Sequence, residues 1–193
     1  ELAHAAQADP LAFRLAHLKN DRLRAVLEKA AKEFGWADRR RQPVAKIGVG
    51  LACGTEKGSY VATCAEVDVD RSNGEIHVRR VCQAFECGTV LNPANLISQN
   101  QGGVIMGLGG ALMEEIRFHD GRILNPRLST YAVPRFKDVP HIDVHLLNRT
   151  DIAPIGAGET PIVGIAPAVA NAVFHATGVR IRSMPLHGKA LKV

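Results

Sequence analysis

The sequence predicts an α+β fold in which an antiparallel or mixed sheet packs against helices. Apolar residues recur at helical spacing in residues 1–36, and they alternate with polar residues in several stretches after residue 46. The 193 residues, 46% of them hydrophobic and 22% charged, are enough for one substantial core. We therefore expect a helical segment at 1–36, a polar, proline-containing linker at 37–45, and an α+β domain at 46–193.

Two helices are expected in the N-terminal segment. Asp9 is placed to cap the first helix, and Pro10 suits a first helical position, where its missing N–H is no loss. Asn20 or Asp21 is placed to cap the second helix, and Gly35 to end it. The second helix carries one apolar stripe, which consists of Leu23, Val26, Leu27, Ala30, Ala31 and Phe34.

A β-hairpin is the clearest strand signal. Residues 60–70 and 75–85 both alternate between apolar and polar side chains, and Asn73-Gly74 between them is a strong hairpin signal. This pattern predicts an antiparallel pair. A second hairpin is expected around Asp120-Gly121. Shorter apolar or alternating runs predict further strands at 47–52, 116–118, 122–124, 142–147 and 179–182.

A long helix is expected from Pro93 to about Glu115, although it contains five glycines: Gly102, Gly103, Gly107, Gly109 and Gly110. Each glycine costs a helix about 1 kcal/mol relative to alanine, so something must require them. One interpretation is close approach of another backbone or of a ligand, with the amide side chains of Gln99 and Gln101 beside that smooth surface. The other is packing of the helix on the sheet, with both glutamines solvated.

Three small residues, Gly156, Ala157 and Gly158, precede the carboxylate of Glu159. A backbone without bulky side chains can approach a ligand closely and direct its N–H groups at it. An apolar helix is expected to follow, from Ala166-Pro167 to a stop at Gly178. The pattern predicts a turn that presents one acid beside a buried helix. The alternative is a tight turn with a helix-capping glutamate.

Charge and hydropathy argue against two classes of function. The net charge is +5, and the only tight basic cluster is Arg39-Arg40-Arg41, without the interleaved aromatic residues of a nucleic-acid surface. No run reaches the roughly 18 apolar residues of a membrane span. We therefore expect neither nucleic-acid binding nor a membrane span.

Cysteine and histidine spacing predicts no metal site. Cys82 and Cys87 are not joined by a second pair at zinc spacing, so we expect reduced thiols in or near the core, with a disulfide as the open alternative. His141 and His145 would lie about 13 Å apart on a strand, too far to share a metal. The four cysteines are Cys53, Cys64, Cys82 and Cys87.

Four stretches, taken in order, resemble the C-terminal part of the molybdenum-binding large subunit of the xanthine dehydrogenase/aldehyde oxidase family. The nearest branch is the large (beta) subunit of isoquinoline 1-oxidoreductase-type enzymes. The resemblance covers nearly the whole chain, and the ordered set is far more specific than any single motif. The stretches are Cys87-Gly-Thr-Val-Leu-Asn-Pro93, Gln99-Asn-Gln-Gly-Gly103 with Gly107-Leu-Gly109, Gly156-Ala-Gly-Glu159, and Ala166-Pro-Ala-Val-Ala-Asn-Ala172 with Thr177-Gly178.

The resemblance implies an enzyme that hydroxylates an electron-poor carbon of an N-heterocycle or aldehyde with water as the oxygen source. Its cofactor is a molybdopterin, usually the cytosine dinucleotide form in bacterial members. By this likeness Glu159 is the general base that accepts the proton of a hydroxyl group at the metal. Gln99 corresponds to the glutamine that hydrogen-bonds the pterin, and Gly156, Ala157 and Gly158 let the backbone pass close to the metal. No residue is expected to ligate the metal.

The resemblance also implies partners and limits. Electrons would leave through a small [2Fe-2S] subunit, and the protein would be bacterial, either cytoplasmic or periplasmic. Gln101 stands where the family often has Glu or His. The family's large subunit is several times longer, so the upstream part would be needed and this chain alone is expected to bind no molybdenum. The alternatives are a non-enzymatic structural or assembly fragment of the same fold and a generic small-molecule-binding domain.

Overall fold

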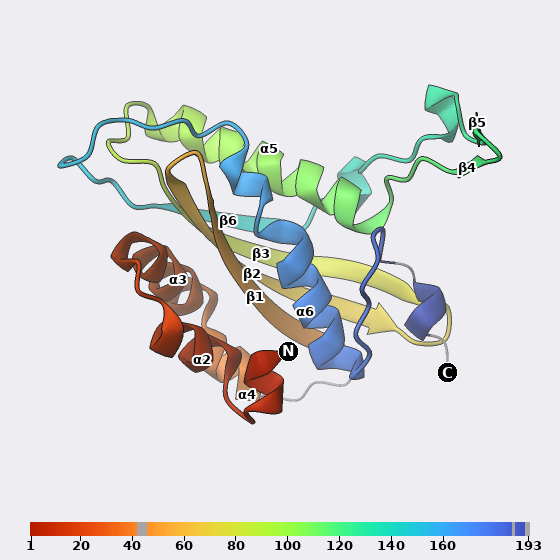
Figure 1. Cartoon of the computed structure of the whole chain (residues 1–193), viewed down its shortest axis with the longest axis horizontal. Helices are drawn as coiled ribbons and strands as arrows, with labels where there is room; N and C mark the ends of the chain where they lie inside the picture. Colours follow the sequence, from red (N-terminus) through yellow and green to blue (C-terminus); the bar gives the residue numbers. More distant parts are fainter. Residues whose placement is uncertain (42–45, 187, 192–193) are drawn as a thin grey trace.

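A computed structural model describes residues 1–41, 46–186 and 188–191. Its centre is a four-stranded sheet in the order β1-β2-β3-β6 (Figure 1). The first three strands are antiparallel neighbours, and β6 runs parallel to β3. This mixed sheet with helices confirms the expected fold class. The strands are β1 (Ile47–Glu56), β2 (Ser59–Asp70), β3 (Glu75–Glu86) and β6 (His141–Leu146).

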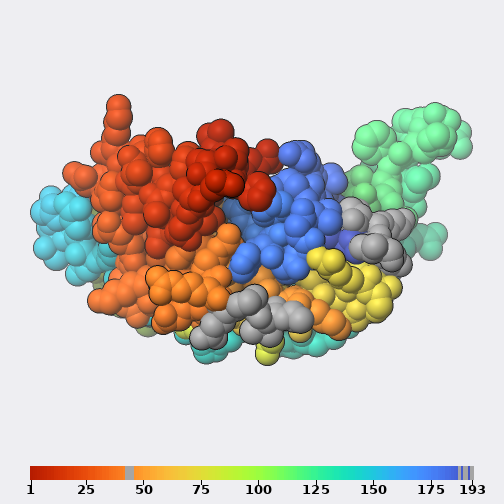
Figure 2. Space-filling view, turned by 90° about the horizontal axis from the view of Figure 1, so that it is seen from below, coloured from red at the N-terminus to blue at the C-terminus, as the bar shows by residue number. Residues whose placement is uncertain are grey.

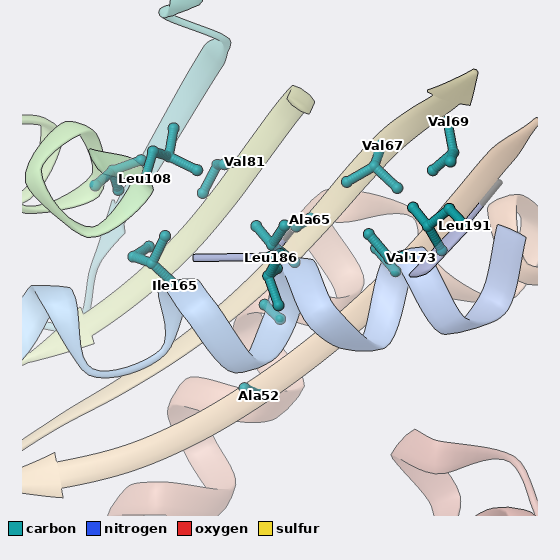
Figure 3. Close-up of a cluster of buried hydrophobic side chains, with 14 residues drawn as sticks. Ala52, Ala65, Val67, Val69, Val81, Leu108, Ile165, Val173, Leu186 and Leu191 are labelled. Atoms are coloured by element: carbon teal, nitrogen blue, oxygen red, sulfur yellow. The ribbon is translucent and has the colours of Figure 1, made fainter. Parts of the chain in front are cut away.

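Helices cover both faces of the sheet. Helix α3 packs on one face, whereas α5 and α6 pack on the other and enclose the larger core cluster (Figures 1 and 3). A separate small hairpin, β4 (Phe118–His119) with β5 (Arg122–Ile123), lies beyond the end of α5. The helices are α1 (Leu2–Ala5), α2 (Pro10–His17), α3 (Asp21–Phe34), α4 (Trp36–Arg41), α5 (Pro93–Leu112) and α6 (Ile165–Thr177), and the 3₁₀ helices are Leu128–Thr130, Phe136–Asp138, Thr160–Ile162 and Gly188–Leu191.

The N-terminal helices form as their capping residues predict. Asp9 accepts hydrogen bonds from the backbone N–H groups of Leu11 and Ala12 and so caps α2. Asn20 caps α3 by accepting from Leu23, and Gly35 ends α3 with a left-handed φ of +73°. The predicted apolar stripe of α3 then packs on the sheet, with Val26, Leu27, Ala30, Ala31 and Phe34 all buried.

The alternation in β2 divides its side chains between the two faces. Val67 and Val69 belong to the cluster under α5 and α6, and Cys64 belongs to the cluster under α3. Gly74 adopts a φ of +80° in the predicted turn, which confirms the hairpin. The four cysteines are free, and burial raises the pKa of Cys82 to about 12, which confirms the expectation of reduced thiols.

Helix α6 lies directly against the backbone of β1. A Cβ atom at Gly48 would come within 2.7 Å of the Ala176 nitrogen, and one at Gly50 would overlap backbone atoms of the same helix. Glycine at these two positions therefore permits a helix-to-strand approach that no other residue allows. The Asn171 side chain donates to the Leu51 carbonyl oxygen (3.1 Å) and ties the two elements together.

Three expectations about elements differ from the structure. Residues 36–41 form α4, whereas a linker was expected from residue 37; residues 42–45 lie outside the described part of the chain. The long helix ends at Leu112, three residues before Glu115. The strand predicted at 179–182 is wrong: these residues form no strand. Val179 and Ile181 pack on the core instead, so side-chain burial alone explains their alternation.

Within the described residues, one segment, Thr160–Thr177, has a length and a mean hydropathy of 1.2 that would suffice to cross a membrane. Most of it is α6, whose residues Ile165, Ala168 and Val169 are fully buried against the sheet. A core helix has the same composition, so this segment is explained by the fold.

Candidate functional site

The site expected from sequence lies where β3 and β6 end. Parallel strands carry their C-terminal ends at the same edge of a sheet, so the loops that follow them emerge side by side. The loop after β3 and the loop after β6 are joined by backbone hydrogen bonds: Thr89 donates to Ile152 (3.0 Å), and Ile155 donates to Cys87 (2.9 Å). The turn at 156–159 follows directly and is held against the sheet edge.

Gln99 contacts this turn. Helix α5 begins at Pro93, capped by Asn92, so Gln99 lies in its second turn. The Gln99 Nε2 atom donates a hydrogen bond of 2.6 Å to the Gly158 carbonyl oxygen. The structure therefore brings together two of the sequence-predicted residues, which are 59 positions apart.

Two hollows flank the turn. A groove of about 400 Å³ is lined by the loop after β3, the first turns of α5 and residues Ala157 and Gly158. A neighbouring hollow of about 230 Å³ is lined by Gly156, Gly158 and Glu159, together with Lys57 and Thr160. Gln99 lines the groove and Glu159 the neighbouring hollow, while Gly158 contributes to both walls. The predicted acid and amide thus lie on the two sides of one bare turn.

Glu159 points away from the core. Its side chain is 58% exposed, and it precedes the 3₁₀ helix Thr160–Ile162. It forms an ion pair with Lys57 of the β1–β2 hairpin, and this hydrogen bond raises the pKa of Lys57. The expected α-helix starts only at Ile165, so Glu159 is not its cap.

The β1–β2 hairpin is hydrogen-bonded to the turn at 156–159 and to the residue that follows it. The buried Ser59 hydroxyl donates to the Gly156 carbonyl oxygen (2.6 Å), and the buried Thr160 hydroxyl donates to the Glu56 carbonyl oxygen (3.0 Å). Sequence reasoning missed Lys57 and Ser59. Lys57 and Gly58 do carry a turn signal, but only the tertiary fold places this hairpin beside residues one hundred positions away.

A buried ion pair supports the loop after β3. Glu86 is 2% exposed and accepts two hydrogen bonds from the Arg22 guanidinium (2.5 and 2.8 Å) and one from the Gly88 N–H (2.5 Å). The hydrogen bond to Glu86 raises the pKa of Arg22, which also lies 4.4 Å from the centre of the Tyr60 ring. Sequence reasoning missed this network, because its partners are 64 residues apart.

The glycines near the turn are not needed by this chain's own packing. A Cβ atom at Gly102, Gly156 or Gly158 would meet nothing within 4 Å, and none of the three has a left-handed φ. Gly103 and Gly107, by contrast, pack against Pro161 and Ile165, where a Cβ would come within 2.9 and 2.8 Å. Bare backbone facing open space is what the close approach of a bound group would require. The residues present therefore fit a cofactor that approaches the turn and α5.

Metal ligation by side chains finds no support in the described ranges 1–41, 46–186 and 188–191. They contain no group of three or more His, Cys, Asp or Glu side chains that could hold a metal ion. Gln101 is exposed and lines neither hollow. The protein's contribution at this site consists of backbone groups, the Gln99 amide and the Glu159 carboxylate.

Comparison with known proteins also indicates a molybdopterin-binding family. Residues 55–140 match the molybdopterin cofactor-binding domain family. The chain is 32% identical to a nicotinate dehydrogenase subunit of Pseudomonas putida over 100% of its own length, and 35% identical to the beta subunit of isoquinoline 1-oxidoreductase of Brevundimonas diminuta over 96%. The chain belongs to the xanthine dehydrogenase/aldehyde oxidase family and corresponds to a part of its molybdenum-binding subunit.

The solved structure of quinoline 2-oxidoreductase from Pseudomonas putida 86 is similar to this chain with a TM-score of 0.64 and 27% identity, over 69% of this chain and 18% of that one. The chain spans 17% and 24% of the two curated relatives. The matched range of the molybdopterin-binding family includes the turn between β1 and β2, the loop after β3 and Gln99, whereas the turn at 156–159 lies outside it.

Proposed function

We propose that this chain forms part of a molybdopterin pocket and supplies the general base for oxidative hydroxylation of an N-heterocycle or aldehyde, with water as the oxygen source. One observation carries the proposal: the Gln99 amide is hydrogen-bonded to the turn that bears Glu159, beside glycines that no internal contact requires. The names of the relatives, which refer to nicotinate, isoquinoline and quinoline, support an N-heterocycle.

In this proposal Gln99, Gly156, Ala157 and Gly158 hold the cofactor through amide and backbone groups. The bound molybdopterin, in its cytosine dinucleotide form, supplies the redox chemistry that oxidises the substrate carbon. The side-chain-free backbone allows a large ligand to lie within hydrogen-bonding distance of the turn. Gly102 extends the same bare surface along α5.

Glu159 accepts the proton that the reaction releases. A general base must be ionised before it acts, and the Glu159 carboxylate forms an ion pair with Lys57. The base also works best when poorly solvated, whereas Glu159 is now 58% exposed. Its burial would come from the cofactor and from the part of the large subunit outside this chain.

The remaining part of the large subunit is the first proposed partner. The β4–β5 hairpin and the residues next to it project beyond the end of α5, as Figure 1 and the green segment of Figure 2 show. Among the exposed large apolar side chains, Phe118, Leu128 and Phe136 are 75%, 92% and 100% exposed. An apolar surface of this kind is typical of an interaction site. We assign it to the upstream part because the chain spans only 17–24% of its curated relatives.

The second proposed partner is a small [2Fe-2S] subunit that removes the electrons. The proposed location is the bacterial cytoplasm or periplasm, and the two curated relatives are bacterial.

The test is Glu159→Gln in the intact large subunit, co-produced with its partners. Loss of a general base lowers kcat by about 100- to 10,000-fold, with molybdenum content unchanged. The control is Glu75→Gln, which removes an exposed carboxylate at the far end of β3 and is expected to leave kcat unchanged. A Glu159→Gln enzyme that keeps kcat within about threefold would refute the role of this residue.

Two further results decide between this proposal and its alternative. The alternative is a non-enzymatic structural or assembly fragment, and it gains support if the reconstituted wild-type protein turns over neither N-heterocycles nor aldehydes. The 193-residue chain alone is expected to bind no molybdenum. Metal analysis that finds stoichiometric molybdenum in the isolated chain would overturn the claim that the upstream part is needed.

A further inference from the structure

A second cavity lies away from the turn, at the other end of β1. Its volume is about 180 Å³, and its walls come from α1, α2, α4, the start of β1 and the second half of α6. None of its lining residues lines the groove or the hollow at the candidate site. From Val49 in this cavity to Lys57 at the hairpin, β1 spans about 26 Å. The cavity is therefore a separate feature.

Positive charge dominates the wall of this cavity. Arg14, Arg40 and Arg180 line it, and Glu1 is the one carboxylate residue among the lining residues. Glu1 is engaged by Arg182 (3.1 Å) and lies 3.9 Å from Arg180. Among the residues that the structure describes, neither Arg14 nor Arg40 forms an ion pair. The cavity thus holds more cationic than anionic groups.

These cations are partly removed from water. Burial lowers the pKa of the Arg40 guanidinium and of the Arg180 guanidinium. The charge of Arg40 also acts on His175 of α6. The pKa of His175 is lowered to about 4, mainly by burial and secondly by this charge. The carboxylates of Asp9 and Glu1 offset part of the effect of burial at Arg40 and Arg180 respectively. An anion in the cavity would offset more of the lost hydration, above all at Arg40, which forms no ion pair with Asp9.

Two aromatic rings and an apolar strand residue also line the wall. The Arg40 guanidinium lies 5.7 Å from the centre of the Trp36 ring, and the Arg180 guanidinium lies 3.6 Å from that of the Phe174 ring. Val49 contributes an apolar surface from β1. A cavity of about 150 Å³ is known to accommodate a benzene-sized molecule, so this cavity has room for one such ring with a small polar group.

We propose that this cavity binds a small aromatic monocarboxylate. The ring packs against the apolar wall, and the carboxylate accepts hydrogen bonds from Arg40, whose planar fork matches the two oxygens. The site is independent of the proposed molybdopterin pocket, because the two share no wall residue. Its ligand is recognised by one negative charge and one flat apolar body.

The first experiment titrates the full chain with three probes of matched size or charge. Trp36 is the only tryptophan, so its fluorescence reports on this cavity directly, and calorimetry gives an independent affinity. Benzoate is expected to bind saturably. Benzamide lacks the charge and phosphate lacks the ring, so each is expected to bind at least about tenfold more weakly than benzoate. Equal binding of benzamide, or tighter binding of phosphate, overturns the assignment of an aromatic carboxylate.

The second experiment changes one arginine at a time on α4. Arg40→Gln is expected to weaken benzoate binding by about tenfold or more, since a hydrogen bond to a charged group is lost. Arg41→Gln is the matched control, because Arg41 is exposed, follows Arg40 directly and does not line the cavity. It removes the same charge and is expected to change the affinity by less than about twofold.

Arg40→Lys is a conservative variant that separates the loss of the guanidinium group from the loss of its charge. It keeps the charge but not the fork, so its affinity is expected to lie between those of the wild type and Arg40→Gln. Circular dichroism and thermal unfolding check that each variant is folded. The proposal is overturned if benzoate shows no saturable binding to the wild type, or if Arg40→Gln and Arg41→Gln weaken binding equally.

Discussion

Two glycine-containing regions of this chain use the same residue for opposite reasons. At the interface of β1 and α6, Gly48 and Gly50 face helix backbone atoms that leave no room for a Cβ. At the candidate site, Gly102, Gly156 and Gly158 face open space. The first group is explained by the fold itself. The second group is not explained by packing within this chain.

This contrast separates a stability role from a binding role. A side chain added at the packed interface should damage the fold, whereas one added at the open turn should leave the fold intact and obstruct a ligand. Four predictions test this difference, from the largest expected effect on stability to the smallest.

Gly50→Ala is expected to destabilise the chain by about 3 kcal/mol or more, because the added Cβ overlaps backbone atoms that cannot rotate away. Urea unfolding measures the change. Truncation of a neighbouring helix side chain, as in Ala172→Gly, is expected not to rescue the variant, since the clash involves backbone. A loss below about 0.5 kcal/mol would show that α6 can shift and would end the contrast between the two regions.

Acid should weaken the packed interface selectively. His175 on α6 accepts a hydrogen bond from the Val49 N–H (3.0 Å), and burial lowers its pKa to about 4. In the unfolded chain its pKa is about 6.5, so the unfolded state binds the proton first. The contribution of this group to stability is therefore complete above about pH 6.5 and is lost as the pH falls towards 4.

The measurement is the free energy of unfolding from about pH 4 to about pH 7, for the wild type and for His175→Gln. The variant is expected to be less stable at neutral pH and to show a shallower slope across this window. Identical slopes would mean that the pKa of His175 does not differ between the folded and the unfolded chain.

Gly102→Ala is expected to stabilise the chain by about 0.5–1 kcal/mol, because glycine costs an open helical position that much relative to alanine. In the intact large subunit the same change is expected to lower molybdopterin retention. Gly110→Ala is the matched control: its Cβ would also meet nothing within 4 Å, and it lies on the same helix about two turns farther from Gln99. Equal cofactor retention in both variants would remove Gly102 from the proposed surface.

Gly156→Ala should have the smallest effect on stability, within about 0.5 kcal/mol, because its Cβ would meet nothing. The expected loss is in cofactor content of the intact large subunit, measured by metal analysis against the wild type. Strong destabilisation of this variant, comparable with that of Gly50→Ala, would contradict the division between packed and open glycines.

Local signals in the sequence account for most of the secondary structure. The Asn73-Gly74 hairpin and the capped α3 were predictable because their determinants lie within a few residues of each other. The alternation at 179–182 misled because a strand needs a neighbouring strand, and side-chain burial alone produces the same pattern. Helix α4 was not predicted, because its residues are mostly polar and Trp36 is its one buried residue.

The candidate site was predictable in its parts but not in its arrangement. Gln99, the Gly156–Gly158 turn and Glu159 came from residue types and a family resemblance, and their roles remain predictions. That Gln99 donates to Gly158, and that Lys57 pairs with Glu159, follows from pairings across about 60 and 100 positions. No local pattern encodes such contacts, because loop closure over that distance depends on the whole sheet.

By itself, the sequence determined the fold class, the main hairpin, the capped helices and the positions of the glycines. Only the tertiary structure decided which glycines are packed and which are bare, and that β6 pairs parallel with β3 so that the two loops meet. The physical reason is that propensity, capping and turn chemistry act over a few residues. Which atoms pack against a residue, by contrast, depends on elements that are distant in the chain.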